Sequence, residues 1–269
     1  MTAMQLLVIA IVQGVTEFLP ISSSGHLILI PHFTGWEDQG VLVDIAVHVG
    51  TLFAIICYFW RDCLGLARGG LATVGLASAP RERVQFWLIV VGTIPAVVLG
   101  LTLKAADALE GFRVPGLVAG NLILYGMMLF AADRLGSKTR SFNEIRFKDA
   151  ILVGLAQALA LIPGTSRSGV TMTAALLLGF TRYEAARFSF LLSIPAVAGA
   201  GLLGALDLAD APGGAQRDAL IAGILTFFAA LGAMAFLMRW LKTSGFLPFI
   251  LYRIGLGLVI YYWFYLRLV

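Results

Sequence analysis

Long apolar segments alternate with short polar ones along the chain of 269 residues. A mostly apolar run of roughly 17–25 residues crosses the hydrocarbon layer of a bilayer as a helix. Six mostly apolar segments occur: 46–60, 86–103, 116–132, 188–206, 219–238 and 247–266. The first five contain no Asp, Glu, Lys or Arg, and the sixth contains only Arg253. The pattern predicts an all-α polytopic membrane protein with six transmembrane helices.

Two further apolar stretches, 3–30 and 150–180, are interrupted at their centres. The interruptions, 20–26 and 163–169, combine Pro and Gly with several serines. Proline and glycine end helices, and serine side chains offer the backbone alternative hydrogen bonds. We therefore expect each stretch to form two short helices joined by irregular backbone.

The basic residues divide the polar segments into two sets. Thirteen Lys and Arg residues lie in the first set and four in the second. The first set comprises 61–83, 133–149, 181–187 and 239–246; the second comprises 31–45, 104–115, 207–218 and the C-terminal end. Because cytoplasmic loops carry an excess of Lys and Arg, the first set is predicted to lie inside and the second outside.

This topology requires the stretch 150–180 to begin and end on the same side of the membrane, so we predict a re-entrant helical hairpin. The similar stretch 3–30 is predicted to be re-entrant too, with the N-terminus outside. At an offset of 144, four residues of the first stretch match four of the second: Gln13 and Gln157, Ser22 and Ser166, Ser24 and Ser168, Gly25 and Gly169. We therefore predict one membrane domain over 1–269, an inverted repeat with halves at about 1–133 and 146–269.

Charged residues make up 13% of the chain, about half of the roughly 25% found in soluble domains. This excludes an ordinary soluble protein. The net charge is +4, but the basic residues lie at predicted helix ends and form no single patch. Nucleic acid is therefore not a predicted partner, whereas the lipid bilayer is.

Three ionisable residues lie beside the predicted breaks: Glu17, His26 and Arg167. Irregular backbone at membrane depth is tolerated only where protein or a water-filled cavity satisfies its polar groups. An intramembrane charge is itself a functional hypothesis by default. We therefore predict one polar cavity shared by both breaks. The alternative is a structural ion pair between Glu17 and Arg167.

The second break has the composition of an anion site. Arg167 is a permanent, planar cation that matches phosphate oxygens. The polar loop around it precedes a predicted helix at 170–180, and backbone N–H groups at a helix N-terminus attract anions. The predicted substrate-binding residues are Gly164, Thr165, Ser166, Ser168 and Gly169 of this loop, together with Gln13 and with Thr171 one turn into the helix. The alternative for Thr171 is a structural hydroxyl bonded to the backbone.

The first break adds groups suited to catalysis. His26 can act as acid, base or nucleophile near neutral pH, and Ser22 or Ser23 can be a hydroxyl nucleophile once a base removes its proton. Glu17 can orient His26 or hold a divalent cation that neutralises phosphate charge. Gln13 lies one helical turn before Glu17 and shares its face.

Two segments, 13–26 (QGVTEFLPISSSGH) and 163–171 (PGTSRSGVT), strongly resemble motifs of the undecaprenyl-diphosphate phosphatases of the bacitracin-resistance family. The resemblance covers essentially the whole chain, including 44–51 (DIAVHVGT). It implies hydrolysis of the C55 isoprenoid diphosphate to the monophosphate at the outer face of the bacterial inner membrane. This reaction recycles the lipid carrier for peptidoglycan synthesis.

The resemblance also implies catalytic roles and a metal. Glu17, His26 and Arg167 are expected to act in catalysis, with Ser22, Ser23, Ser166 and Thr171 nearby, and Mg²⁺ or Ca²⁺ is expected to stimulate the reaction. The family's first motif is (Glu/Gln)-x-x-x-Glu. This chain has Gln13 at the first position, which leaves Glu17 as the single carboxylate for a metal.

Several points stay open at this stage. The nucleophile can be Ser23, Ser22, His26 or water. His48 is expected near the outer membrane interface, with a position in the cavity as the alternative. Arg253 is expected to extend to the cytoplasmic surface. The rival functions are a flippase or transporter of a lipid phosphate or anion, which would use the same site, and a structural scaffold. The oligomeric state is open, a homodimer included.

Overall fold

The computed structural model describes residues 1–37, 39–106, 110–112, 114–209 and 213–266. These residues form helices and connecting turns, with no strand beyond one isolated bridge between Arg140 and Phe180. The helices are α1 (Ala3–Phe18), α2 (Ser23–Thr34), α3 (Gly40–Tyr58), α4 (Trp60–Thr73), α5 (Pro80–Ala105), α6 (Pro115–Leu135), α7 (Phe147–Leu159), α8 (Arg167–Leu177), α9 (Arg182–Ala209), α10 (Gly213–Trp240) and α11 (Leu247–Tyr261). The predicted all-α class is confirmed.

Five helical stretches in the described part of the chain are long and apolar enough to cross a membrane. They are α3, α5, α6, α10 and the segment Leu247–Leu266, which joins α11 to a final π-helical turn. These five match five of the six predicted spans. The remaining predicted span, 188–206, lies within α9, and the side chains of its last residues fall outside the described part.

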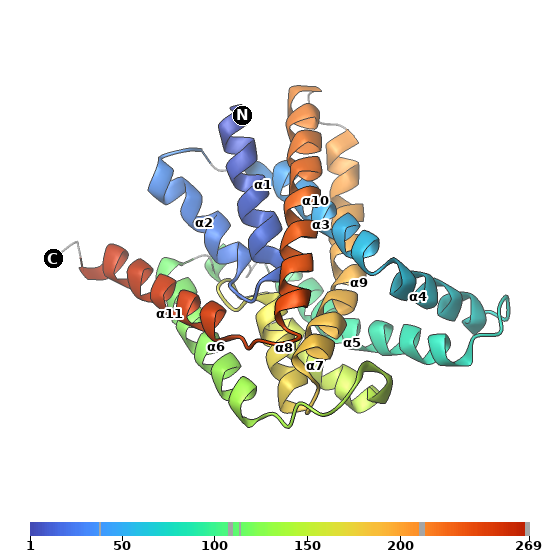
Figure 1. Ribbon diagram of the computed structural model, residues 1–269. Helices are drawn as coiled ribbons and strands as arrows, with labels where there is room; N and C mark the ends of the chain where they lie inside the picture. Colours follow the sequence, from blue (N-terminus) through green and yellow to red (C-terminus); the bar gives the residue numbers. More distant parts are fainter. Residues whose placement is uncertain (38, 107–109, 113, 210–212, 267–269) are drawn as a thin grey trace.

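The two predicted breaks are present, and each separates a pair of helices. The first lies between α1 and α2, and the second between α7 and α8. Both pairs turn near the middle of the molecule (Figure 1). The second helix of each pair begins earlier than the sequence predicts, at Ser23 and Arg167. The reason is that the preceding serine in each case caps the helix.

Ser22 and Ser166 have the same unusual local geometry. Both adopt a left-handed φ, 76° and 70°, which is uncommon for residues other than glycine and is stored as strain at functional sites. The Ser22 hydroxyl accepts from Gly25 N at 3.4 Å, and the Ser166 hydroxyl accepts from Gly169 N at 3.1 Å. The serines and glycines that match at the 144-residue offset are therefore also alike in local structure.

Long helices enclose these two central pairs. α10 packs along both α1 and α3, α11 packs along α6, and α5 packs along α7 (Figure 1). Gly50 allows the close approach of α3 and α10, because a Cβ at this position would collide with the carbonyl of Gly223. Small residues at helix crossings are typical of membrane proteins, where close backbone approach supplies packing energy.

Ion pairs tie the helix ends together at the basic loops. Arg182 pairs with Asp133 at 2.6 Å, which joins the start of α9 to the end of α6. Arg140 pairs with Asp149 at 2.6 Å beside the start of α7. Arg187 of α9 pairs with Asp62 of α4. Part of the basic excess in these loops is therefore matched by carboxylates that fix the ends of the bundle.

Candidate active site

The two breaks meet at a cavity of about 250 Å³. Its walls come from α1, α2, α3, α5, α7, α8 and α9 and from the second break. The lining residues are Thr16, Glu17, Ser23, Ser24, His48, Ala96, Gln157, Ala160, Leu161, Ser166, Arg167, Ala196 and Val197. The cavity therefore has one polar region, built mostly from the breaks, and an apolar wall from α5 and α9.

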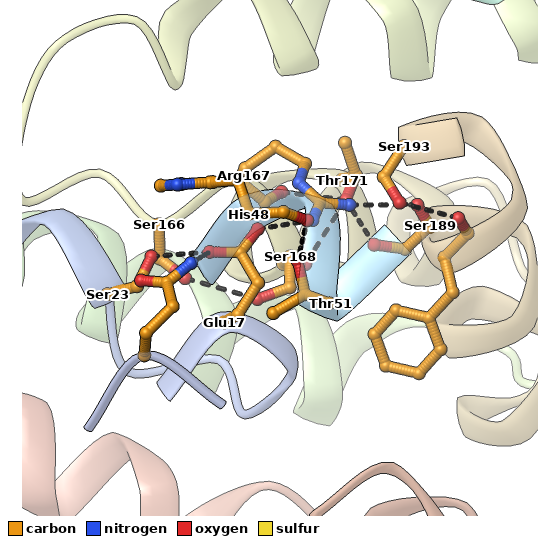
Figure 2. Close-up of polar contacts among 12 residues, drawn as sticks. Glu17, Ser23, His48, Thr51, Ser166, Arg167, Ser168, Thr171, Ser189 and Ser193 are labelled. Atoms are coloured by element: carbon orange, nitrogen blue, oxygen red, sulfur yellow. Dashed lines mark hydrogen bonds and ion pairs between the residues drawn. The ribbon is translucent and has the colours of Figure 1, made fainter. Parts of the chain in front are cut away.

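Glu17 joins the two helix pairs through its carboxylate (Figure 2). Its Oε1 accepts from Arg167 Nη2 at 2.6 Å, across 150 residues of sequence. Its Oε2 accepts from Ser23 Oγ at 2.6 Å and from Gln13 Nε2 at 3.1 Å. The Glu17 side chain is 7% exposed, so water screens this ion pair little. The ion pair weighed as an alternative is present, and a cavity hydroxyl shares its carboxylate.

Arg167 is the first residue of α8, and Ser189 and Thr171 contact it on the side away from the cavity. Its Nη1 donates to the carbonyl of Ser189 at 3.4 Å. The Thr171 hydroxyl donates to the carbonyl of Arg167 at 2.8 Å and lies 2.6 Å from the Ser189 hydroxyl. Thr171 is fully buried and is not part of the cavity lining. Its position therefore indicates support of Arg167 and no direct contact with a ligand.

The serines of the two breaks have different positions. Ser23 and Ser166 line the cavity, whereas Ser22 and Ser168 lie behind its surface. The Ser168 hydroxyl donates to the carbonyl of Leu19 at 3.3 Å, which joins the two breaks directly. Of the two predicted hydroxyl nucleophiles, Ser23 is the one beside Glu17, and Ser22 is a helix cap.

Arg253 connects the two breaks on their side away from the cavity. Its side chain is completely buried. The guanidinium donates to the carbonyls of Pro20, Gly164 and Thr165 at 3.4, 3.0 and 2.8 Å, and also to two carbonyls of α6. The prediction that Arg253 extends to the cytoplasmic surface is wrong. Carbonyls left without helical partners by the breaks satisfy the guanidinium inside the protein instead.

Three predicted phosphate-binding residues face Arg253. Gly164 and Thr165 present their carbonyls to its guanidinium. A Cβ at Gly169 would lie 2.6 Å from its Nη1. None of the three belongs to the cavity lining described above. Gly169 therefore leaves room for the buried guanidinium, and Gly164 and Thr165 accept from it through their carbonyls. The sequence pattern had assigned these three residues to an anion.

His26 lies outside the cavity lining. Its Nδ1 is 2.7 Å from the carbonyl of Ser22 and must donate, because a carbonyl oxygen only accepts. Its Nε2 therefore accepts from the hydroxyl of Tyr252 on α11, also at 2.7 Å. The two rings are stacked, with centroids 5.6 Å apart. His26 therefore contacts Tyr252. The option that Glu17 orients His26 is not seen in this structure.

His48 supplies the imidazole that lines the cavity. Its Nδ1 lies 2.6 Å from the carbonyl of Asp44 and must donate, so Nε2 carries no proton in the neutral ring. The ring lies beside Glu17 and Arg167 in the cavity wall (Figure 2). His48 therefore takes the cavity position, the alternative left open for it. An acid, an imidazole and a guanidinium do meet, but the imidazole belongs to α3.

The donor set fits a preformed divalent-cation site poorly. No group of three His, Cys, Asp or Glu side chains suited to a metal ion occurs among the described residues. Glu17 is the one carboxylate in the cavity lining. Both of its oxygens already accept from Arg167, Ser23 and Gln13. A cation bound there would compete with a guanidinium, so we derive no step through a metal.

The residues that sequence reasoning missed carried partial signals. His48 lies within the motif 44–51, and Gln157 matches Gln13 at the 144-residue offset. Arg253 is the one charge in its predicted span, and the rule that drew attention to Glu17 applies equally to it. Tyr252 had no signal, because a single tyrosine in an apolar helix is unremarkable.

Comparison with known proteins decides the family. The family model for the bacitracin resistance protein BacA matches residues 6–259. The chain belongs to this family. The undecaprenyl-diphosphatase of Erythrobacter litoralis is 55% identical, over 96% of this chain and 98% of the relative. Those of Ruegeria pomeroyi and Marinobacter nauticus are 44% and 45% identical, again over 97% of this chain and 98% of each relative. The resemblance seen in the sequence is confirmed.

We expect Arg253→Met to lower the free energy of unfolding by about 3 kcal/mol, because it leaves several buried carbonyls without a donor. The loss should appear in the thermal midpoint of the purified protein in detergent. Arg134→Met is the matched control, since Arg134 is exposed and surface substitutions usually change stability by less than about 0.5 kcal/mol. Equal stability of the two variants would contradict the role given to Arg253.

Proposed function

We propose that the chain is a membrane phosphatase that hydrolyses undecaprenyl diphosphate to undecaprenyl phosphate and inorganic phosphate. In this role it recycles the lipid carrier for peptidoglycan synthesis. The observation that carries the proposal is the 2.6 Å hydrogen bond from Ser23 to Glu17 beside the Arg167 guanidinium, in a cavity between two broken helix pairs. The curated relatives are named undecaprenyl-diphosphatase.

The proposed reaction starts with an exchange of partners at Arg167. A phosphate oxygen of the substrate replaces Glu17 on part of the guanidinium, which leaves the Glu17 carboxylate more basic. Glu17 then accepts the Ser23 proton while Ser23 Oγ attacks the terminal phosphorus. The bond to the bridging oxygen breaks, and undecaprenyl phosphate leaves with that oxygen. The leaving phosphate takes the Ser23 proton from Glu17. In a second step water attacks the phosphoserine, Glu17 accepts a proton from the water and returns it to Ser23 Oγ, and inorganic phosphate leaves.

Position distinguishes the candidate nucleophiles. Ser23 combines exposure to the cavity with a carboxylate acceptor, whereas Ser22 is buried as a helix cap. His26 has both ring nitrogens occupied by Ser22 and Tyr252. A catalytic role for His26 stays a prediction of the family resemblance. Direct attack by water stays the alternative to Ser23.

The surroundings of the cavity suit a lipid substrate. An apolar groove of about 540 Å³ runs between α3 and α10 and reaches Gly201 of α9. α3 also carries His48 into the cavity, and α9 carries Val197. An isoprenoid tail in this groove would leave its diphosphate near Arg167. A flippase needs binding but no hydroxyl–carboxylate pair, so Ser23 and Glu17 favour hydrolysis.

The proposed membrane arrangement follows from the charge pattern. α3, α5, α6, α9, α10 and α11 cross the bacterial inner membrane, and the α1–α2 and α7–α8 pairs are re-entrant. The halves 1–133 and 146–269 then form an inverted repeat, with the basic loops in the cytoplasm and the cavity open to the outer side. The equal geometry of Ser22 and Ser166 supports this relationship.

We expect Ser23→Ala, Glu17→Ala and Arg167→Ala each to lower the rate of phosphate release from the C55 diphosphate by a factor of about 10² to 10⁴. Ser22→Ala is the neighbouring control. It should cost about 1 kcal/mol of stability through the lost cap and keep the rate of the folded enzyme within about tenfold. Phosphate release from purified protein measures the rates, and the thermal midpoint measures the stability of the Ser22→Ala variant. Wild-type rates in the Glu17 and Arg167 variants would end the enzymatic assignment.

We expect His48→Leu to lower kcat by about tenfold to a hundredfold, the range for losing a polar group beside the reacting atoms. His32→Leu is the matched control, because His32 lies near the end of α2, outside the cavity lining. Steady-state kinetics with the C55 diphosphate checks this. If both variants keep the wild-type kcat, His48 has no part in the reaction.

Stimulation by Mg²⁺ or Ca²⁺ stays a prediction, and we propose that a cation binds together with the substrate diphosphate. Gln13→Glu would place a second carboxylate one turn from Glu17 and create a protein ligand pair. We expect this variant to reach half-maximal activity at about a tenfold lower Mg²⁺ concentration. Titration of activity with Mg²⁺ after EDTA treatment measures the shift. An unchanged Mg²⁺ dependence would contradict this account of the site.

The orientation predicts which face reacts with an impermeant thiol reagent. Cys57 and Cys63 are free thiols, so the experiment starts from a variant with both replaced by alanine. In intact cells stripped of their outer membrane, Gly214→Cys should react and Asn143→Cys should not. The reverse labelling pattern would invert the proposed topology.

A further inference from the structure

Gln157 is a buried amide with no hydrogen-bond partner among the described residues. It lies in the last turn of α7 and is 3% exposed. Neither its Nε2 nor its Oε1 makes a hydrogen bond. Leaving a buried polar group unsatisfied costs about 1–3 kcal/mol, and such groups in native structures call for an explanation.

The side chain of Gln157 forms part of the cavity wall. It shares that wall with Glu17, Ser23 and Arg167. The other buried side-chain atoms without partners in the described part of the chain are Gln13 Oε1 and the hydroxyls of Thr165 and Thr226, and none of these residues lines the cavity. Among the described residues, Gln157 therefore combines an unsatisfied buried side chain with a position in the cavity wall.

The comparison with Gln13 sharpens the point. The two glutamines match at the 144-residue offset, and each lies near the end of the first helix of its pair. Gln13 donates its Nε2 to Glu17, whereas Gln157 has no carboxylate one turn later, because position 161 is a leucine. The first glutamine supports the acid, and the second is left facing the cavity.

We propose that Gln157 is a substrate-binding residue that donates its Nε2 hydrogens to an oxygen of the substrate diphosphate. The proposal rests on the proposed function, which supplies the phosphate. A neutral amide suits this position because Arg167 already provides a positive charge, and a second donor fixes the orientation of the phosphate. A carboxylate there would repel the same oxygens.

The binding role makes stability and activity change in opposite directions in one variant. Gln157→Met keeps the length of the side chain and removes its polar atoms. We expect a thermal midpoint equal to or above that of the wild type, because an unsatisfied polar group is removed. We also expect KM for the C55 diphosphate to rise about tenfold or more with kcat within a few-fold, as for a lost hydrogen bond to a charged group.

Two further variants complete the design. Gln157→Glu should raise KM more than Gln157→Met, since it adds repulsion. Thr226→Val removes an unsatisfied hydroxyl away from the cavity, so it should raise stability and leave KM unchanged. A normal KM in Gln157→Met would overturn the proposal, because the amide would then make no contact with the substrate. An unstable or unfolded variant would also overturn it, because the amide would then be needed for the fold.

Inorganic phosphate separates this proposal from the proposed function. Phosphate should raise the thermal midpoint of the wild type, and reaching the same shift with Gln157→Met should need about tenfold more phosphate. If the wild type released no phosphate from the C55 diphosphate but this difference persisted, the proposed reaction would fail and the binding role would stand. Equal phosphate dependence in both proteins would overturn the binding role alone.

Discussion

The ion pair between Glu17 and Arg167 is the contact on which the candidate site depends. It joins the end of α1 to the start of α8, and it does so beside two interrupted helices. Two opposite charges buried together hold each other in place, whereas either one alone would be costly at that depth. Because both residues lie beside a break, the pair fixes the position of the breaks relative to each other. Ser23 and Ser166 then face a common space.

A second buried cation solves the problem that the breaks create. Interrupting a helix leaves carbonyls without partners, and in a membrane water cannot reach most of them. Arg253 donates to carbonyls of both breaks and of α6. The two arginines therefore have different roles. Arg167 lines the cavity and pairs with Glu17, whereas Arg253 stabilises the backbone of the two breaks. Their chemical type is the same, and only their surroundings differ.

The sequence was sufficient for the five apolar spans, the two breaks and the meeting of Glu17 with Arg167, but it did not predict α4 within the basic segment 61–83. Apolar length predicts spans, and a charge beside a proline-rich break predicts a shared polar site. The contacts of the His26, His48 and Arg253 side chains could not be predicted. Helical periodicity does not tell which face of a helix packs against a partner far away in sequence. Arg253 and Pro20 are 233 residues apart. The carbonyls that hold the guanidinium exist only after both breaks have folded, so no local pattern announces them.

The position of Arg253 in α11 has a consequence for biogenesis. Chains are synthesised from the N-terminus, and early segments insert before late ones. Both broken helix pairs are therefore synthesised before the guanidinium that bonds to their carbonyls. The carbonyls of Pro20, Gly164 and Thr165 lack this donor until the last helix is in place. A chain without α11 would keep Glu17 and Arg167 but would lose the guanidinium that joins the backbones of the two breaks.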